Sequence, residues 1–143
     1  MKTFFALIIL FTAMTGSTLM AAEKTTENTM TPHETELFKK CNMESRNALI
    51  HGNVKLVEEI CMQTISEIEK NHKSSELTIN PLMNLAFLYT LSGNFDKATP
   101  LYDKARKISV EAYGADSAQV EAIDSRIRAQ EDGKKQLNNK AAN

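Results

Sequence analysis

Residues 84–108, NLAFLYTLSGNFDKATPLYDKARKI, constrain the fold more than any other part of the chain. Alanines recur among large apolar and aromatic side chains at near-helical spacing, as expected for one face of an α-helix. Gly93 interrupts the pattern at its centre, and glycine readily takes the left-handed conformation that ends a helix. The stretch therefore predicts two helices that fold back on each other at Gly93, with Ala86 facing Ala98 where they approach most closely.

Helical spacing continues through residues 32–130, and no convincing alternation of apolar and polar residues indicates a strand. The order Thr31, Pro32, Glu34 predicts a capped first helix, because Thr31 and Glu34 can form a capping box around a proline that suits the first turn. The later helices are expected to begin at Val54, Asn80–Pro81, Phe95 and Asp116. The helix that begins at Val54 is expected to end near residues 71–75, and the helix that begins at Phe95 to end near Tyr113. Because the connections are short, five helices with antiparallel neighbours are expected.

An internal repeat supports the same organisation. Gly52 recurs 41 positions later as Gly93, each followed by asparagine, and an ungapped superposition aligns apolar and small positions along the next helix. Cys61 then coincides with Tyr102. The chain is therefore expected to hold two helix hairpins and one further helix, in a helical domain of residues 32–131.

Residues 82–122 resemble a tetratricopeptide repeat, specifically the longer variety found in kinesin light chains and many bacterial proteins. The matching positions are Leu85, Ala86, Tyr89, Gly93, Phe95, Ala98, Tyr102 and Ala105, followed by YGAD at residues 113–116. Pro100, which removes a helical hydrogen bond, occurs in the same variety. Residues 37–71 match weakly. The resemblance implies an all-α fold in which two antiparallel hairpins and a capping helix stack as a short right-handed superhelix.

Tetratricopeptide arrays bind extended or helical peptide segments in a concave groove lined by the first helix of each pair. The resemblance therefore implies a non-catalytic protein–protein interaction module. The groove positions are expected at Lys39, Asn42, Arg46, Met83, Asn84, Phe87, Asp124 and Arg128, with Asn84 bonding the backbone of a bound peptide. Solvation of an exposed helix face explains the polar members equally well, whereas Met83 and Phe87 are apolar groups on a face predicted to be exposed.

The N-terminus has the order of a secretory signal. Lys2 precedes an apolar run, and small residues lead to Ala22, after which cleavage is expected. An uncleaved membrane anchor is the alternative, although the apolar run is short for a bilayer. We expect a signal peptide at 1–22, a flexible lead-in at 23–31 and a disordered polar tail at 132–143, with export to the periplasm or beyond and no stable membrane insertion after cleavage.

Cys41 and Cys61 are the two cysteines of the chain. An even count in an exported protein favours a bridge. They lie 11 residues before and 9 residues after Gly52, so an antiparallel hairpin that turns at Gly52 brings them face to face. A disulfide between Cys41 and Cys61 is predicted, and two buried free thiols are the alternative.

The remaining composition excludes more functions than it selects. The 17 Lys and Arg and 18 Asp and Glu residues are interspersed, without the basic stripe typical of nucleic-acid binders. No metal-ligand or phosphate-loop motif is present, and the histidines lie at predicted helix ends away from the cysteines, so no catalytic residue, metal or cofactor is expected. Two repeats are fewer than the three or so usually needed for stability, which makes self-association an alternative. A secreted helical effector, or a ligand carrier or enzyme accessory protein with the repeats as scaffold, is the other alternative.

Overall fold

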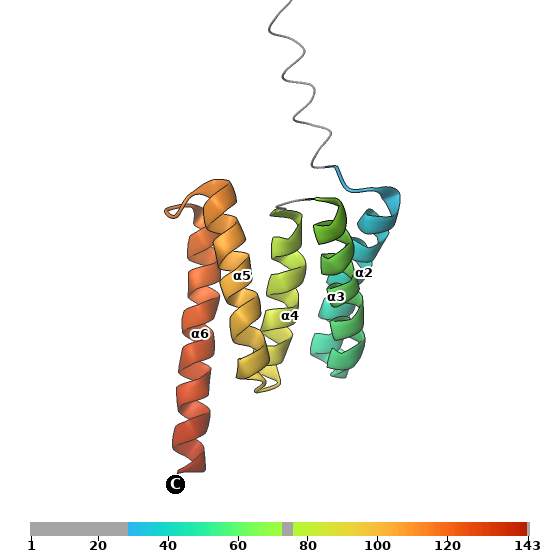
Figure 1. Cartoon of the computed structure of the whole chain (residues 1–143). Helices are drawn as coiled ribbons and strands as arrows, with labels where there is room; N and C mark the ends of the chain where they lie inside the picture. Colours follow the sequence, from blue (N-terminus) through green and yellow to red (C-terminus); the bar gives the residue numbers. More distant parts are fainter. Residues whose placement is uncertain (1–28, 73–75, 143) are drawn as a thin grey trace, which may run out of the picture.

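The computed structural model describes residues 29–72 and 76–142. The regular elements of these residues are α2 (Pro32–His51), α3 (Val54–Asn71), the 3-10 turn η1 (Glu76–Thr78), α4 (Ile79–Leu91), α5 (Phe95–Tyr113) and α6 (Ala118–Ala141). Successive α-helices run antiparallel and follow one another across the molecule in chain order (Figure 1). The prediction of an all-α fold with antiparallel neighbours is confirmed. The signal peptide expected at 1–22, and residues 23–28 of the expected lead-in, lie outside the described residues.

The helix ends follow the local sequence at most positions. Thr31 Oγ1 accepts a hydrogen bond from the Glu34 backbone N–H, and Glu34 Oε2 accepts one from the Thr31 backbone N–H, so the predicted capping box is present. Gly52 and Gly93 both have φ of 72°, the left-handed conformation predicted at the two turns. Pro100 lies inside α5.

Two helices begin elsewhere than predicted. The helix expected to start at Asn80–Pro81 starts at Ile79, because η1 leads directly into α4 through Thr78, whose backbone is already helical. Pro81 then falls in the first turn, where a missing N–H removes no helical bond. The last helix is capped by Ser117 and not by Asp116, since the Ser117 hydroxyl accepts the bond from the Val120 backbone N–H.

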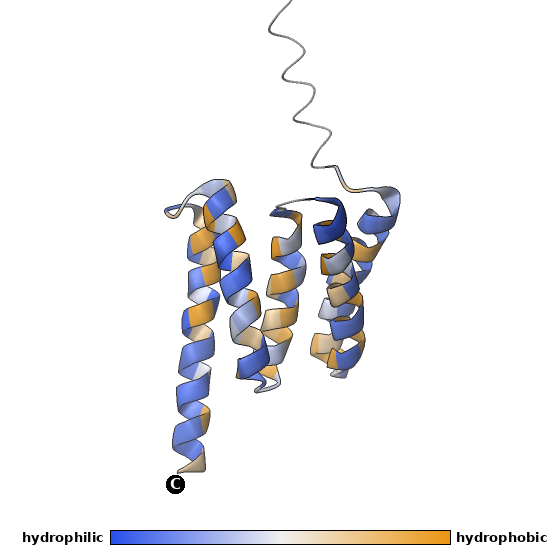
Figure 2. Ribbon diagram, viewed as in Figure 1, coloured by the Kyte–Doolittle hydropathy of each residue, from blue (hydrophilic) through white to orange (hydrophobic). Residues whose placement is uncertain are grey.

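The disordered tail predicted at 132–143 is wrong for most of its length, because α6 continues to Ala141. Gln130 is buried, and its Nε2 donates to Thr99 Oγ1 of α5 at 2.6 Å. Lys134 Nζ lies 3.6 Å from Asp96 Oδ1 at the start of α5. Gln130 and Lys134 thus contact α5, whereas residues 134–141 are exposed and the end of α6 projects beyond α4 and α5 as a polar helix (Figure 2).

The core lies between the helices in two adjoining clusters. Ala86 and Ala98 are fully buried in one cluster with Tyr89 and Tyr102, where α4 packs on α5. The second cluster consists of Ile65, Leu82, Ala105 and Ile123 and joins α3, α4, α5 and α6. The alanines allow close approach of α4 and α5, as the spacing predicted, and Tyr89 and Tyr102 pack in the same cluster.

Gly133 offers a direct test of the α6 extension. A Cβ at this position would lie 3.8 Å from the Phe95 ring, an ordinary contact, so Gly133→Ala is expected to raise the free energy of unfolding by about 0.5–1 kcal/mol through helix propensity. Urea unfolding measures the change. Gly114→Ala is the matched control and should destabilise, because Gly114 has φ of 88°. A destabilised Gly133→Ala would contradict a helical α6 at this position.

Candidate partner-binding groove

Two pockets adjoin on the side of the molecule where α2, α4 and α6 come together. The α2–α4 pocket, of about 240 Å³, is lined by Asn42, Ser45, Arg46, Leu49, Asn84, Phe87, Leu88 and Arg126. The α4–α6 pocket, of about 540 Å³, is lined by Phe87, Thr90, Leu91, Phe95, Tyr102, Arg126, Ala129, Gly133, Gln136, Leu137 and Lys140. Phe87 and Arg126 line both pockets, and we call the two together the groove.

A direct amide contact joins α2 to α4 in the groove. Asn84 Nδ2 donates to Asn42 Oδ1 at 2.7 Å, and both side chains are half-buried. An amide side chain carries one acceptor oxygen and two N–H donors. The contact uses the nitrogen of Asn84 and the oxygen of Asn42, so the opposite ends of the two amides offer an acceptor and donors for the backbone of a bound segment.

Phe87 and Arg126 separate the two pockets. The Arg126 guanidinium lies 4.5 Å from the centre of the Phe87 ring, a cation–π contact between α4 and α6. The ring is half-buried and the arginine is exposed. The contact positions a cation beside both pockets while leaving its charge accessible.

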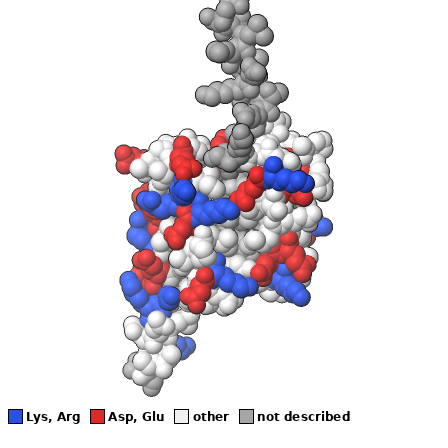
Figure 3. All heavy atoms as spheres, viewed as in Figure 1, with Lys and Arg blue, Asp and Glu red and all other residues white. Residues whose placement is uncertain are grey.

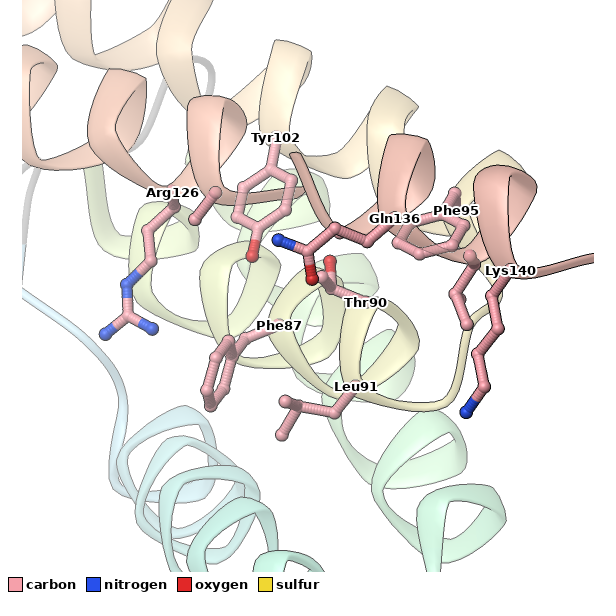
Figure 4. A pocket seen from close by; sticks show the side chains of 11 residues that line it. Phe87, Thr90, Leu91, Phe95, Tyr102, Arg126, Gln136 and Lys140 are labelled. Atoms are coloured by element: carbon pink, nitrogen blue, oxygen red, sulfur yellow. The ribbon is translucent and has the colours of Figure 1, made fainter. Parts of the chain in front are cut away.

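The α4–α6 pocket has a polar centre and apolar walls. In Figure 4 the Tyr102 hydroxyl points toward Thr90 and Gln136, while Phe87 and Leu91 lie on one side and Arg126 and Lys140 lie at opposite ends. Burial raises the pKa of the Tyr102 hydroxyl, although hydrogen bonding with Thr90 and the charge of Arg126 act against that rise. The phenol is therefore neutral at physiological pH.

The groove is locally cationic. Arg46, Arg126 and Lys140 are its charged lining residues, and no carboxylate is among the described residues that line the two pockets. Elsewhere the charges are interspersed, as Figure 3 shows for one face, and many are paired. Lys97 Nζ, for example, lies 3.2 Å from Glu58 Oε1. The positive character of the groove is thus a property of that surface and not of the whole chain, whose formal net charge is −1.

No protein-family model, curated protein or solved structure matches this chain. Within the described ranges, no helix combines the length and the apolar content that crossing a bilayer requires. The geometry of the groove therefore provides the basis for a functional assignment.

The structure brings four of the eight expected groove residues into one pocket. Asn42, Arg46, Asn84 and Phe87 all line the α2–α4 pocket. Lys39 is exposed on α2. Met83 instead packs against both core clusters, because its side chain turns inward between α4 and its neighbours.

The two positions expected on α6 point elsewhere. Asp124 Oδ1 accepts from Arg106 Nε of α5 at 2.6 Å, and this bond lowers the pKa of Asp124. Arg128 donates to Glu121 at 2.7 Å along α6 itself. Arg126, two positions before Arg128, lies in the groove instead and lines both pockets.

The predicted disulfide lies directly behind the α2–α4 pocket. Cys41 and Cys61 are fully buried, with sulfurs 2.02 Å apart and Cα atoms 4.9 Å apart. Ser45, a lining residue, donates to the Cys41 carbonyl oxygen at 2.7 Å, and its Oγ lies 3.7 Å from Cys61 Sγ. The bridge therefore fixes α2 on α3 at the level where α2 forms its side of the groove.

Proposed function

We propose that this chain is a non-catalytic interaction module that holds an extended or helical segment of a partner protein in the groove. The observation that carries the proposal is the convergence of Asn42, Asn84 and Phe87 on one pocket between α2 and α4. The two amides suit a peptide backbone, which needs both an acceptor and a donor. The aromatic ring supplies apolar area beside them.

The arrangement of the helices supports the tetratricopeptide-like form of this proposal, a short right-handed superhelix of two hairpins and a capping helix. In that form the first helix of each pair lines the groove, and here α2, α4 and α6 supply nearly all lining residues. α2 contacts α4 directly and α4 contacts α6, while α3 and α5 pack behind them. The buried disulfide is compatible with the proposed export to an oxidising compartment.

A peptide-display selection with the intact chain tests this function. Peptides selected on the parent chain are expected to bind the Asn84→Ala, Phe87→Ala double variant at least about tenfold more weakly, because the variant loses a backbone contact and an apolar anchor. The control is Gln63→Ala with Ser66→Ala, which alters two exposed residues of α3 at the same spacing. Circular dichroism verifies that both variants are folded. Equal binding by the groove variant and the parent would remove the proposal.

Self-association is a second proposal, favoured by exposed apolar residues on α2. Met43 is 55% exposed and Ile50 is 78% exposed, and their spacing of seven places them on one face of the helix. Sedimentation equilibrium of the intact chain measures this directly. A monomer at all concentrations up to the millimolar range would exclude assembly through α2.

A further inference from the structure

The α4–α6 pocket exists because α6 extends past residue 131. Gly133, Gln136, Leu137 and Lys140 form one wall, and all four belong to the extension of α6. The opposite wall comes from the end of α4 and the start of α5. The polar C-terminal part of α6 thus completes the larger pocket of the groove.

The two walls present apolar side chains that the fold leaves in water. Leu91 of α4 is 59% exposed and Leu137 of α6 is 51% exposed, and both line this pocket. Burying such surface is favourable by about 25 cal/mol per Å². Gly133, in the α6 wall, has no side chain and therefore leaves space beside the Phe95 ring. An atom of this ring is the nearest that a Cβ at Gly133 would meet. A bulky apolar side chain from a partner would fill this space and bury the exposed apolar surface of Leu91 and Leu137.

The two ends of the pocket carry positive charge. Arg126 and Lys140 are 14 positions apart on α6, which is about 20 Å along a helix. Neither takes part in the ion pairs found between the described residues. Because no described residue lining this pocket is a carboxylate, the charge complementary to it is negative.

We infer that the α4–α6 pocket binds an acidic amphipathic segment of a partner protein. A bulky apolar side chain lies between Leu91 and Leu137, and carboxylates near the two ends of the segment meet Arg126 and Lys140. A span of about 20 Å corresponds to about six residues of extended chain. This inference rests on the proposed function and names the chemistry of the partner segment.

Displayed twelve-residue random peptides are the probe, selected on the intact chain at low salt. Enriched sequences are expected to combine Leu, Ile, Met or Phe with Asp or Glu, and their binding should weaken as salt increases. Enrichment of basic peptides, or of apolar peptides without carboxylates, would overturn the inference.

Two variants test the pocket itself. Gly133→Leu fills the space beside Phe95, and Arg126→Glu reverses the charge at one end, so each should lower the affinity of the enriched peptides by about tenfold or more. Arg128→Glu is the matched control two residues away and should change affinity by less than about twofold. Peptides in which only the acidic residue at the Arg126 end is replaced by lysine should regain binding to Arg126→Glu, because the other end still meets Lys140. Unchanged affinity in Gly133→Leu, with circular dichroism of a folded chain, would contradict the inference.

The outcome separates this inference from the proposed function. Peptides that require Asn84 but are indifferent to Gly133→Leu and Arg126→Glu would overturn the acidic-segment inference and support the groove as a peptide site. Peptides that require Gly133 and Arg126 but tolerate Asn84→Ala would support the inference and remove the role of the amides. A library that yields no binding peptide would overturn both.

Discussion

Replacing Cys41 and Cys61 together by alanine is expected to lower the free energy of unfolding by about 3 kcal/mol. The bridge closes a loop with a sequence separation of 20, and a cross-link of this length removes about that much entropy from the unfolded chain. Since small domains are stable by only about 5–15 kcal/mol, this is a large share of the total. Urea unfolding of the parent and the double variant, at equal protein concentration, measures the difference.

The composition of the first hairpin explains why it depends on a bridge. In the ungapped superposition Cys61 stands where the second hairpin has Tyr102, and Thr64 stands where it has Ala105. Thr64 is buried, and its hydroxyl donates to the Leu37 carbonyl oxygen of α2 at 3.2 Å. The α2–α3 contact therefore lacks the aromatic that Tyr102 provides between α4 and α5, and the disulfide replaces that packing.

Thiol labelling provides the control for this prediction. Alkylation of the unfolded parent should modify no cysteine before reduction and both Cys41 and Cys61 after it, because both sulfurs are in the bridge. A parent that labels without reduction would show free thiols, and equal unfolding free energies of parent and variant would show that the bridge does not stabilise the fold.

The features that could be predicted from sequence are those fixed by local chemistry. The Thr31–Glu34 capping box and the positive φ of Gly52 and Gly93 depend on residues a few positions apart, and each is present. The pairing of Cys41 with Cys61 followed from the symmetry of an antiparallel hairpin about its turn. Such inferences need only the helical period and the identity of the turn residue.

The features that could not be predicted from the sequence depend on how one helix packs against another. The sequence does not indicate that Gln130 is buried against Thr99 or that Lys134 lies beside Asp96, and the helix continues through the polar residues 132–141. Arg126 lies in the groove, whereas Asp124 and Arg128, the two positions expected there, pair with Arg106 and Glu121. The side that α6 turns toward α4 and α5 depends on tertiary packing, which local sequence does not specify.

A buried carboxylate joins the two ends of the first hairpin. Glu34, near the start of α2, is 1% exposed, and its Oε1 accepts from Asn71 Nδ2 at 2.8 Å at the end of α3. Its Oε2 accepts from the Thr31 backbone N–H at 2.7 Å and lies 3.2 Å from His72 Nε2. The sequence predicted the capping box but not the partners that lie nearly forty positions away.

Burial by itself raises the pKa of Glu34, but the hydrogen bonds from Asn71, Thr31 and His72 outweigh it and lower the pKa from 4.5 to about 2. The folded chain therefore favours the ionised carboxylate more than the unfolded chain does. The resulting stabilisation is fully present above about pH 4.5 and is lost as the pH falls toward 2. A shift of this size corresponds to about 3 kcal/mol at neutral pH.

Glu34→Gln is expected to lower the free energy of unfolding by about 2 kcal/mol at pH 7, because the neutral amide keeps the shape but accepts weaker hydrogen bonds. The difference in unfolding free energy between variant and parent should shrink as the pH falls from 4.5 toward 2, because the parent carboxyl then becomes neutral, as the amide already is. Urea unfolding across this range measures it, with Glu36→Gln as the control for an exposed carboxylate on the same helix. A difference that stays constant from pH 7 to pH 2 would assign the loss to packing and not to the charge of Glu34.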